Sequence, residues 1–471
     1  MTSNNAAHSA NKAESWAFET RQIHAGQTTD PTTGAVSLPI YQTTAYEFPS
    51  PEVAAARFAL QELGPIYTRI GNPTQEVVEN RIANLEGGVG ALLTASGSSA
   101  IQLAILNLVN AGDHIVASSS LYGGTFNLLQ HTLPKLGVTT TFVADQADLQ
   151  QWRDAVQPNT KLLFGETLAN PGANVLDIEN IAEIAHANGI PLIVDNTVPT
   201  PYLLRPIEFG ADVVIHSATK FLGGHGSVIA GAIVDSGNFD YGSELARDKF
   251  PGFNEPDESY HGLVYARDLG VGSAFGTNLS YILKARVQLL RDLGPAISPL
   301  SAWLVDQGIE TLSLRLQRHV ENAQKVAEWL ENRPEVAKVK YAGLPSSDEY
   351  LRGQKYLPKG SGAVLSFELN EPDLELARIK GAAFVGALEL HLNVANIGDV
   401  RSLVIHPAST THSQLTPEQQ VAAGVSPGLV RLSVGLEHID DIIADLELGF
   451  TAVQAKVQEL TETASAQILA A

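Results

Sequence analysis

Residues 211–226 read ADVVIHSATKFLGGHG. The first five of them form a mostly apolar run with the length of a buried strand. Lys220 follows this run in a strip that also carries the hydroxyl residues Ser217 and Thr219 and ends in glycines. In an open α/β sheet, ligands bind beyond the carboxyl ends of the strands. Lys220 is therefore placed where a ligand would bind, although a single lysine is more often a solvated surface charge.

Apolar runs upstream of this strip predict the rest of a sheet. Between them, apolar residues recur every three to four positions, which is typical of amphipathic helices. Alternation of this kind predicts an α/β fold whose mostly parallel sheet is covered by helices on both faces. The predicted strands are 91–95, 114–117, 161–164, 191–194 and 211–215, and the predicted helices are 98–109, 125–136 and 178–188.

The pattern changes on both sides of this sheet. Residues 16–71 contain proline turns and little periodicity, which favours an extended arm that lies on a neighbouring subunit. Later in the chain, a helix at 316–332, strand-like pieces and a last helix from 439 indicate a smaller α+β domain, and 249–267 is polar enough for a surface loop. We therefore expect an arm at 1–71, a ligand-binding domain at 72–312 and a C-terminal domain at 313–471. The strand-like pieces are 339–341, 363–367 and 430–434.

Composition excludes several functional classes. The 471 residues include 51 acidic and 30 basic side chains, a net charge of −21 that repels nucleic acids and anionic membranes. The sequence contains neither an apolar run long enough for a membrane span nor a basic, apolar opening, so we expect a cytoplasmic protein. It also lacks cysteine. Covalent catalysis would therefore need a lysine, a hydroxyl, a carboxylate or a bound cofactor.

Common nucleotide and metal motifs are absent from the sequence. It contains no G-x-x-x-x-G-K-[ST] and no H-E-x-x-H, and no G-x-G-x-x-G joins a strand to a helix. His406 and His412 are close in sequence but have no carboxylate ligand between them. We interpret them as structural histidines and expect no metal site.

Three features at predicted strand ends give Lys220 a context. Residues 96–99 read SGSS between a strand and a helix, where N–H groups and hydroxyls hold phosphate, although a serine cap looks the same. Asp195 ends a strand and could pair with a protonated ring nitrogen, or cap a turn. Tyr122 follows a strand and could stack on a flat cofactor, or belong to a turn. With Lys220 as a Schiff-base lysine, these features together describe a site for pyridoxal 5'-phosphate (PLP).

The string SATKFLGGH at 217–225 resembles the cofactor-lysine motif of the PLP-dependent Cys/Met metabolism family. That family includes cystathionine synthases and lyases, methionine γ-lyase and homoserine-ester sulfhydrylases. The resemblance implies a fold-type-I PLP-dependent transferase with a central, mostly parallel sheet, an extended N-terminal arm and a smaller α+β C-terminal domain. Further matches are YTRIGNPT at 67–74, LEGG at 85–88, VDNT at 194–197, HPAS at 406–409 and VRLSVGLE at 430–437.

The resemblance also implies roles for individual residues. Lys220 would carry the cofactor, and Tyr122 would stack on it and assist proton transfers. Arg431 would grip the substrate carboxylate, for which its planar fork is suited, with Asn396 and Arg401 beside it. The other implied cofactor contacts are Tyr67 and Arg69 from a neighbour's arm, Gly97, Ser98, Ser217 and Thr219 at the phosphate, Asn170 near the phenolic oxygen, and Asp195 at the ring nitrogen.

Departures from the motifs point within the family. The chain has an insertion around 240–269, and NIGDVRSL at 396–403 stands where lyases and cystathionine synthases usually carry an acidic residue near Arg401. Gly124 replaces a cysteine found in some γ-lyases. These features favour a sulfhydrylase that replaces the acetoxy group of O-acetylhomoserine with sulfide or methanethiol. The arm implies a homo-oligomer that is at least a dimer, and the resemblance implies a tetramer by family habit.

Alternatives share most of these features. Cystathionine γ-synthase and methionine γ-lyase would have the same cofactor site and differ in the nucleophile. An aminotransferase would convert its cofactor to the amine form, and a binding protein would use the pocket without catalysis. The acyl group could be acetyl or succinyl.

Overall fold

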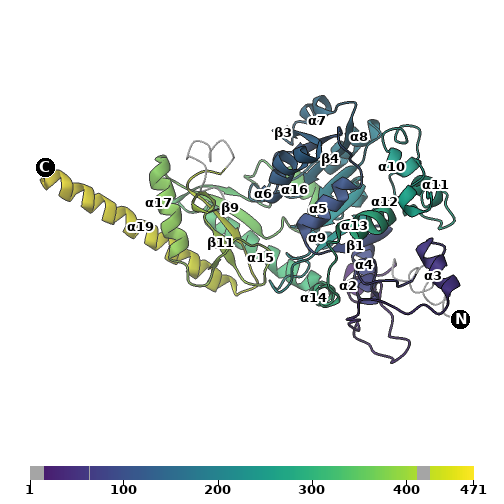
Figure 1. Ribbon diagram of the computed structural model, residues 1–471. Coiled ribbons are helices and arrows are strands. Elements are labelled where there is room, and N and C mark those ends of the chain that lie inside the picture. Colours follow the sequence, from purple (N-terminus) through teal and green to yellow (C-terminus); the bar gives the residue numbers. More distant parts are fainter. Residues whose placement is uncertain (1–14, 63, 411–424, 471) are drawn as a thin grey trace. The chain divides into compact units, whose positions relative to one another are not determined.

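The computed structural model describes residues 15–62, 64–410 and 425–470, and its chain forms two compact units (Figure 1). Unit 1 comprises Met1–Thr167, Leu176–Gly223 and Ser227–Ser313. Unit 2 comprises Leu168–Val175, Gly224–Gly226 and Leu314–Ala471. The predicted division into an arm at 1–71, a cofactor domain at 72–312 and a C-terminal domain at 313–471 stays a prediction.

Unit 1 is built on a seven-stranded sheet in the order β1-β7-β6-β5-β4-β2-β3. Every neighbouring pair is parallel except the two that involve β7, so β7 alone runs against the others. The predicted α/β class and all five predicted strands are confirmed. The strands are β1 (Gly90–Thr94), β2 (His114–Ser118), β3 (Thr139–Val143), β4 (Thr160–Glu166), β5 (Leu192–Asp195), β6 (Val213–His216) and β7 (Gly231–Asp235).

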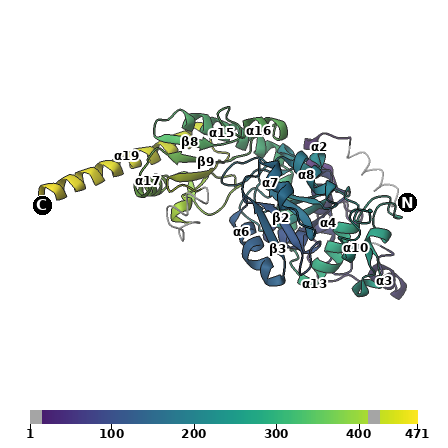
Figure 2. The ribbon, with the colours of Figure 1, turned by 90° about the horizontal axis from the view of Figure 1, so that it is seen from above.

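Helices pack against this sheet, as Figure 1 and Figure 2 show. They include α4 (Pro73–Glu86), α5 (Gly97–Leu106) and α8 (Ile178–Ala187). The predicted helix at 125–136 is instead three pieces: α6 (Gly123–Asn127), a π turn η1 (Leu128–Thr132) and a 3₁₀ turn η2 (Leu133–Leu136). Pro134 lacks an N–H and cannot continue an α-helical ladder, which explains the break.

The predicted surface loop at 249–267 is partly buried. It contains α10 (Pro251–Asn254), η4 (Glu258–Tyr260) and α11 (Tyr265–Asp268). Phe253 stacks on Tyr241 with ring centroids 4.2 Å apart, and Tyr265 is fully buried. Aromatic residues scattered through a polar segment therefore give this insertion an apolar core, which its average polarity concealed.

The predicted arm contains two short helices, α2 (Phe18–His24) and α3 (Pro51–Phe58). Several of its apolar side chains are exposed, including Val36 and Ile40. Contact of this segment with a neighbouring subunit stays a prediction. In the part of the chain that the structure describes, no helix is long and apolar enough to cross a bilayer.

Unit 2 contains a five-stranded sheet in the order β10-β11-β12-β9-β8, antiparallel except between β10 and β11. The predicted strands and helices of the C-terminal region are confirmed. Helices α17 and α19 pack on each other through Phe384 and Phe450, and in Figures 1 and 2 the last turns of α19 extend beyond the rest of the unit. The elements are α15 (Leu312–Glu331), β8 (Val336–Lys340), β9 (Val364–Leu369), α17 (Leu374–Gly386), β10 (Leu392–Asn393), β11 (Leu403–Ile405), β12 (Leu429–Ser433) and α19 (Ile439–Ala470).

Candidate active site

The first turn of α5 and the segment after β6 meet in unit 1. Ser96 caps α5 by accepting a hydrogen bond from the Ser99 N–H at 3.1 Å. Gly97 lies so close to Ser217 that a Cβ atom on it would be 2.6 Å from the Ser217 Cβ, which only glycine avoids. The unpaired N–H groups of a helix start and a serine hydroxyl therefore lie together. This is the donor set that binds a phosphate.

The segment that carries Lys220 is fixed by backbone contacts. The Ser217 N–H donates to Thr197 Oγ1 at 2.8 Å, and the Lys220 N–H donates to the Ser217 carbonyl at 3.0 Å. The Thr219 hydroxyl donates to the Ala230 carbonyl at 3.1 Å and accepts from the Ala230 N–H at 2.9 Å. These contacts form a tight turn that holds the half-buried Lys220 just beyond β6.

Asp195 ends β5 and is 9% exposed. Its Oδ1 accepts a hydrogen bond from the Thr197 N–H at 2.9 Å. Burial raises the pKa of Asp195, while the hydrogen bonds of Thr197 and the nearby His216 act in the opposite direction. A buried carboxylate of this kind is stabilised by a cation, which a protonated pyridine nitrogen would provide.

Tyr122 precedes α6, and its ring lies over Gly124. A Cβ atom on Gly124 would be 2.4 Å from the Tyr122 Cε1, so the ring keeps this position because residue 124 has no side chain. The Tyr122 N–H donates to Oε1 of the buried Glu166 at 2.5 Å. Sequence reasoning missed Glu166. An acidic residue that closes the apolar run of β4 was the available signal.

A second acid was also missed, behind the strand that leads to Lys220. Glu86 Oε1 lies 2.6 Å from His216 Nε2 and accepts from the Asn196 amide at 3.0 Å. Glu86 and His216 have no exposed surface. Glu86 belongs to the LEGG string at 85–88, so the family motif pointed to it without giving it a role.

The predicted substrate-binding residues lie in unit 2, and two of them are in contact. Arg431 in β12 donates through Nη2 to the backbone carbonyl of Asn396 at 3.0 Å. Arg431 is also paired in register with Ser366 of β9, whose hydroxyl donates to the Pro171 carbonyl at 2.9 Å. Asn170, next to that proline, has a buried Oδ1 with no hydrogen-bond partner among the described residues. Unit 2 thus gathers Asn170, Asn396 and Arg431.

The other predicted residues lie at the surface. Arg401 is exposed and pairs with Asp399 at 2.8 Å. Tyr67 and Arg69 are exposed in unit 1, with the Arg69 guanidinium 5.4 Å from the centre of the Tyr67 ring. Ser98 is exposed at the start of α5. Exposed residues of this kind are available to a ligand or to another subunit.

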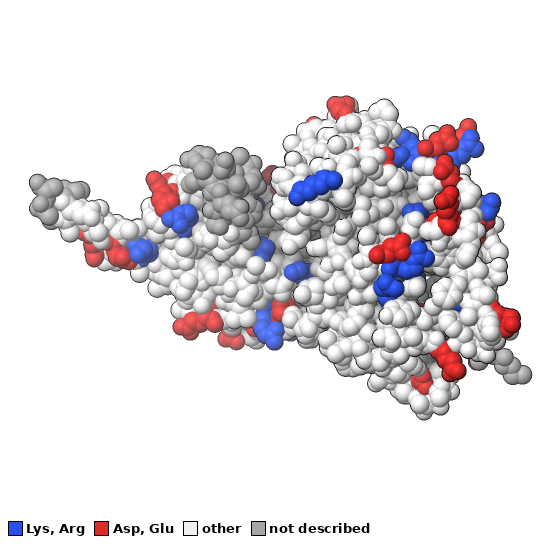
Figure 3. Space-filling view, viewed as in Figure 1, with Lys and Arg blue, Asp and Glu red and all other residues white. Residues whose placement is uncertain are grey.

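His406 is satisfied by the protein itself, because its Nδ1 lies 2.8 Å from the Ser409 hydroxyl and its Nε2 lies 2.7 Å from the Pro427 carbonyl. His412 lies outside the described residues. Among the residues that are described, no group of three or more histidines and acids has the arrangement of a metal site. On the face shown in Figure 3, basic side chains are scattered singly or beside acidic ones, and they do not form one large patch.

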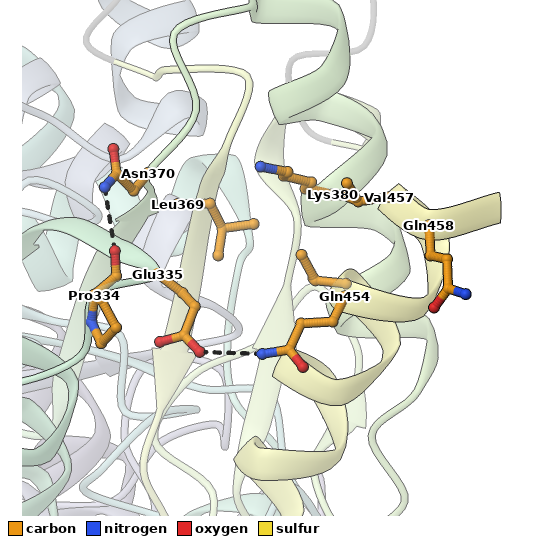
Figure 4. A pocket seen from close by; sticks show the side chains of 9 residues that line it. Pro334, Glu335, Leu369, Asn370, Lys380, Gln454, Val457 and Gln458 are labelled. Atoms are coloured by element: carbon orange, nitrogen blue, oxygen red, sulfur yellow. Dashed lines mark hydrogen bonds between the residues drawn. The ribbon is translucent and has the colours of Figure 1, made fainter. Parts of the chain in front are cut away.

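A cavity of about 470 Å³ in unit 2 is separate from these residues, since none of the predicted site residues lines it. Glu335 Oε1 accepts from the Gln454 amide there at 3.4 Å (Figure 4). Lys380, which also lines the cavity, pairs with Glu371. The lining is Pro334, Glu335, Leu369, Asn370, Lys380, Val453, Gln454, Val457 and Gln458. Since Glu335, Asn370 and Lys380 each have a protein partner, we assign the cavity no role.

The residues of unit 1 fit PLP. Gly97 and Ser217, which lie in close contact at a helix start, would form a cradle for its phosphate, Asp195 is a buried carboxyl group, and Lys220 ends the adjacent turn. A mostly parallel sheet with these groups at the carboxyl ends of its strands defines a PLP-dependent enzyme of fold type I.

The profile of the family described as "Cys/Met metabolism PLP-dependent enzyme" matches residues 19–451. The chain belongs to this family, and its cofactor is PLP. The predicted family and the predicted cofactor are therefore confirmed.

Two bacterial sulfhydrylases share more than half of their aligned residues with the chain. The chain is 55% identical over 442 residues to the O-acetyl-L-homoserine sulfhydrylase of Corynebacterium glutamicum, covering 94% of this chain and 98% of that protein. It is 53% identical over 431 residues to the O-acetyl-L-homoserine sulfhydrylase of Leptospira meyeri, covering 91% and 95%. Among solved structures, the O-acetylhomoserine (thiol)-lyase of Campylobacter jejuni, which contains N'-pyridoxyl-lysine-5'-monophosphate, is 41% identical with a TM-score of 0.85, covering 92% and 99%.

Proposed function

We propose that the protein replaces the acetoxy group of O-acetyl-L-homoserine with sulfide or methanethiol, which yields homocysteine or methionine together with acetate. The main support for this proposal is the 55% identity to a sulfhydrylase over nearly the whole of both chains. The gathered Gly97, Ser217, Lys220 and Asp195 support the same chemistry. We propose methionine biosynthesis in the cytoplasm as its setting.

The residues of unit 1 would hold the cofactor. The N–H groups of Gly97 and Ser98 and the Ser217 hydroxyl would bind its phosphate, because Ser217 lies against the start of α5. The Thr219 hydroxyl, which bonds to Ala230 in the single chain, would join them. The Asp195 carboxylate would hold a proton on the pyridine nitrogen, and the ring of Tyr122 would stack on the cofactor. When bound, PLP acts as an electron sink that stabilises negative charge at the substrate Cα.

The substrate would be oriented by unit 2. Arg431 would bind the α-carboxylate through its planar fork, with Asn396 and Arg401 beside it, and Asn170 would contact the phenolic oxygen of the cofactor. The Lys220 amine would take the proton from Cα and would pass it on before it takes a second proton from Cβ. Acetate would leave from Cγ with the electron pair of the C–O bond, and the sulfur nucleophile would add to Cγ and lose its own proton. Lys220 would then return protons to Cβ and Cα.

The active enzyme would be a homo-oligomer, a dimer at least and a tetramer by family habit. The arm at 1–71 would reach a neighbouring subunit, where Tyr67 and Arg69 would contact the cofactor phosphate. The exposure of both side chains in the single chain supports this role.

An assay of the purified protein with PLP and sulfide tests the proposal. We expect homocysteine and acetate from O-acetylhomoserine, and less product from the succinyl ester. Three further incubations distinguish the alternatives. Methionine alone yields ammonia and a keto acid if the protein is a γ-lyase, and added cysteine yields cystathionine if it is a synthase. An added amino acid yields its keto acid together with the amine form of the cofactor, without release of ammonia, if it is an aminotransferase. Absence of homocysteine from the sulfide reaction would contradict the proposal.

A further inference from the structure

The position of Tyr122 depends on contacts to its backbone. Its ring is 54% exposed in the single chain, so little packing holds the ring itself. The Tyr122 carbonyl accepts from the Phe126 N–H at 3.0 Å, which starts α6, and the Tyr122 N–H donates to Glu166 Oε1 at 2.5 Å. The direction of the ring is therefore set by how the start of α6 is attached to the sheet.

Glu166 attaches it through a buried carboxyl group. The residue is 6% exposed and ends β4, between neighbouring strands of the sheet. A carboxylate that accepts from an N–H group forms a bond about twice as strong as a neutral acceptor would form. Burial away from water keeps that bond strong. Glu166 is thus a firm anchor for the residue that carries the ring.

Glu166 also lies beside Asp195. The two residues are register partners in the parallel strands β4 and β5, so their side chains leave the sheet on the same face. One carboxylate is placed to meet the cofactor nitrogen in the proposed function, and the other holds the residue that would stack on the same cofactor. The adjacent strands fix the spacing between these two contacts.

We propose that Glu166 is a positioning residue that acts through Tyr122: its carboxylate fixes the Tyr122 backbone and so holds the aromatic ring where it stacks on the cofactor. Gly124 completes the arrangement, because a side chain there would collide with the ring. This proposal rests on the proposed function, since it assumes that the Tyr122 ring contacts PLP.

The test is a double-mutant cycle on PLP binding, measured by titrating the apoenzyme with PLP and following the visible absorbance and the circular dichroism of the cofactor band. We expect Glu166→Gln, which keeps the size of the side chain and loses its charge, to raise the Kd for PLP about 3- to 10-fold. Glu166→Ala, which removes the acceptor, should raise it about 10-fold or more and reduce the dichroism. In the background of Tyr122→Ala the same changes should alter Kd by less than about twofold, because no ring remains to be held.

Asp212→Asn is the matched control. Asp212 is a buried acid at the other end of the sheet, where its Oδ2 accepts from the Leu192 N–H at 2.8 Å. This variant should change the Kd for PLP by less than about twofold. If it raises Kd as much as the Glu166 variants do, the effect comes from loss of any buried acid, and the proposal is overturned.

Two further results would overturn it. Glu166 variants could leave Kd and the dichroism unchanged, or could raise Kd by the same factor with and without the Tyr122 ring. Thermal unfolding of each variant shows that the comparison uses folded protein, and Glu166→Gln serves if the alanine variant does not fold. A wild-type protein that binds PLP but makes no homocysteine would contradict the proposed function and leave this inference standing.

Discussion

In unit 1 the residues that would act on the cofactor follow strands, whereas in unit 2 Arg431 lies within one. The strands of the unit 1 sheet are buried on both faces, and the groups that would act on the cofactor stand at their carboxyl ends, because Asp195 is the last residue of β5 and Lys220 follows β6. The mostly antiparallel sheet of unit 2 leaves Arg431 half-buried in the middle of β12. The mostly parallel sheet of unit 1 therefore presents its functional groups at the ends of strands, whereas the mostly antiparallel sheet of unit 2 presents Arg431 on its face.

Replacing Lys220, which follows a strand end in unit 1, should have the largest effect on activity. Lys220→Ala should lose the visible absorbance of bound cofactor and lower kcat on the order of 10⁴-fold or more, because both the covalent attachment and the general base are lost. Spectra and product assays measure this, with the exposed Lys135→Ala as control. A Lys220→Ala variant with nearly normal turnover would refute the assignment.

Replacing the guanidinium of Arg431 tests the group on the face of the unit 2 sheet. Arg431→Lys should lower kcat/KM for O-acetylhomoserine by about 100-fold, mainly through KM, because a lysine cannot bind a carboxylate with two parallel bonds. The Kd for PLP should change little. Arg378→Ala, at an exposed ion pair on α17, is the control. An unchanged KM would show that another group binds the carboxylate.

Two buried acids, one in each unit, should change the free energy of unfolding with pH in opposite directions. Asp445 of unit 2 should have the larger effect. It accepts from the N–H groups of Glu389, Leu390 and His391 and from His391 Nδ1, at 2.7 to 3.0 Å. Burial alone would raise the pKa of Asp445, but these hydrogen bonds lower it well below its ordinary value. Its stabilisation is therefore present above pH 4 and is lost as the pH falls further.

Asp445→Ala should lower the free energy of unfolding by about 3 kcal/mol at pH 7, because three backbone donors lose their acceptor. The difference from wild type should shrink in acid. Urea unfolding followed by circular dichroism measures both values, with the exposed Asp440→Asn as control. A difference that does not depend on pH would contradict the assigned charge.

Asp235, in β7 of unit 1, should have a smaller effect on the pH dependence of stability than Asp445 has. Burial raises the pKa of Asp235 to about 7. The folded state then keeps a proton that the unfolded chain loses between about pH 4 and 7, so this residue lowers stability as the pH rises. The free energy of unfolding of Asp235→Asn, taken relative to that of the wild type, should rise by about 2 kcal/mol between pH 4 and pH 8. The same difference for the exposed Asp248→Asn should not change with pH. An equal pH response of both variants would show that Asp235 is charged throughout.

The strands that the sequence predicted correctly in unit 1 are those with continuous apolar runs. The strands it missed lack that signal for different reasons. β3 consists largely of threonines at the edge of the sheet, and β7 is a short run behind a glycine-rich loop. Position in the sheet, which a single sequence does not contain, decides whether such segments become strands.

The candidate site was predictable where a side chain acts from a strand end or belongs to a family motif. Lys220 and Asp195 met the first condition, and Arg431 met the second. Glu166 also ends a strand, but it was missed because its contact with Tyr122 exists only when β2 and β4 lie side by side. The contact of Asn396 with Arg431 uses a backbone carbonyl, which residue identity does not reveal.

The order of strands also determines when the phosphate cradle forms during synthesis. β1 leads directly into the cradle at the start of α5, yet it lies at the sheet edge and pairs with β7, which follows it far along the chain. Contacts between residues distant in sequence form late, because a long loop must close first. A nascent chain can therefore hold Gly97 against Ser217 only after β2 to β6 have been synthesised, and we expect the ability to bind the cofactor to be acquired late in the folding of unit 1.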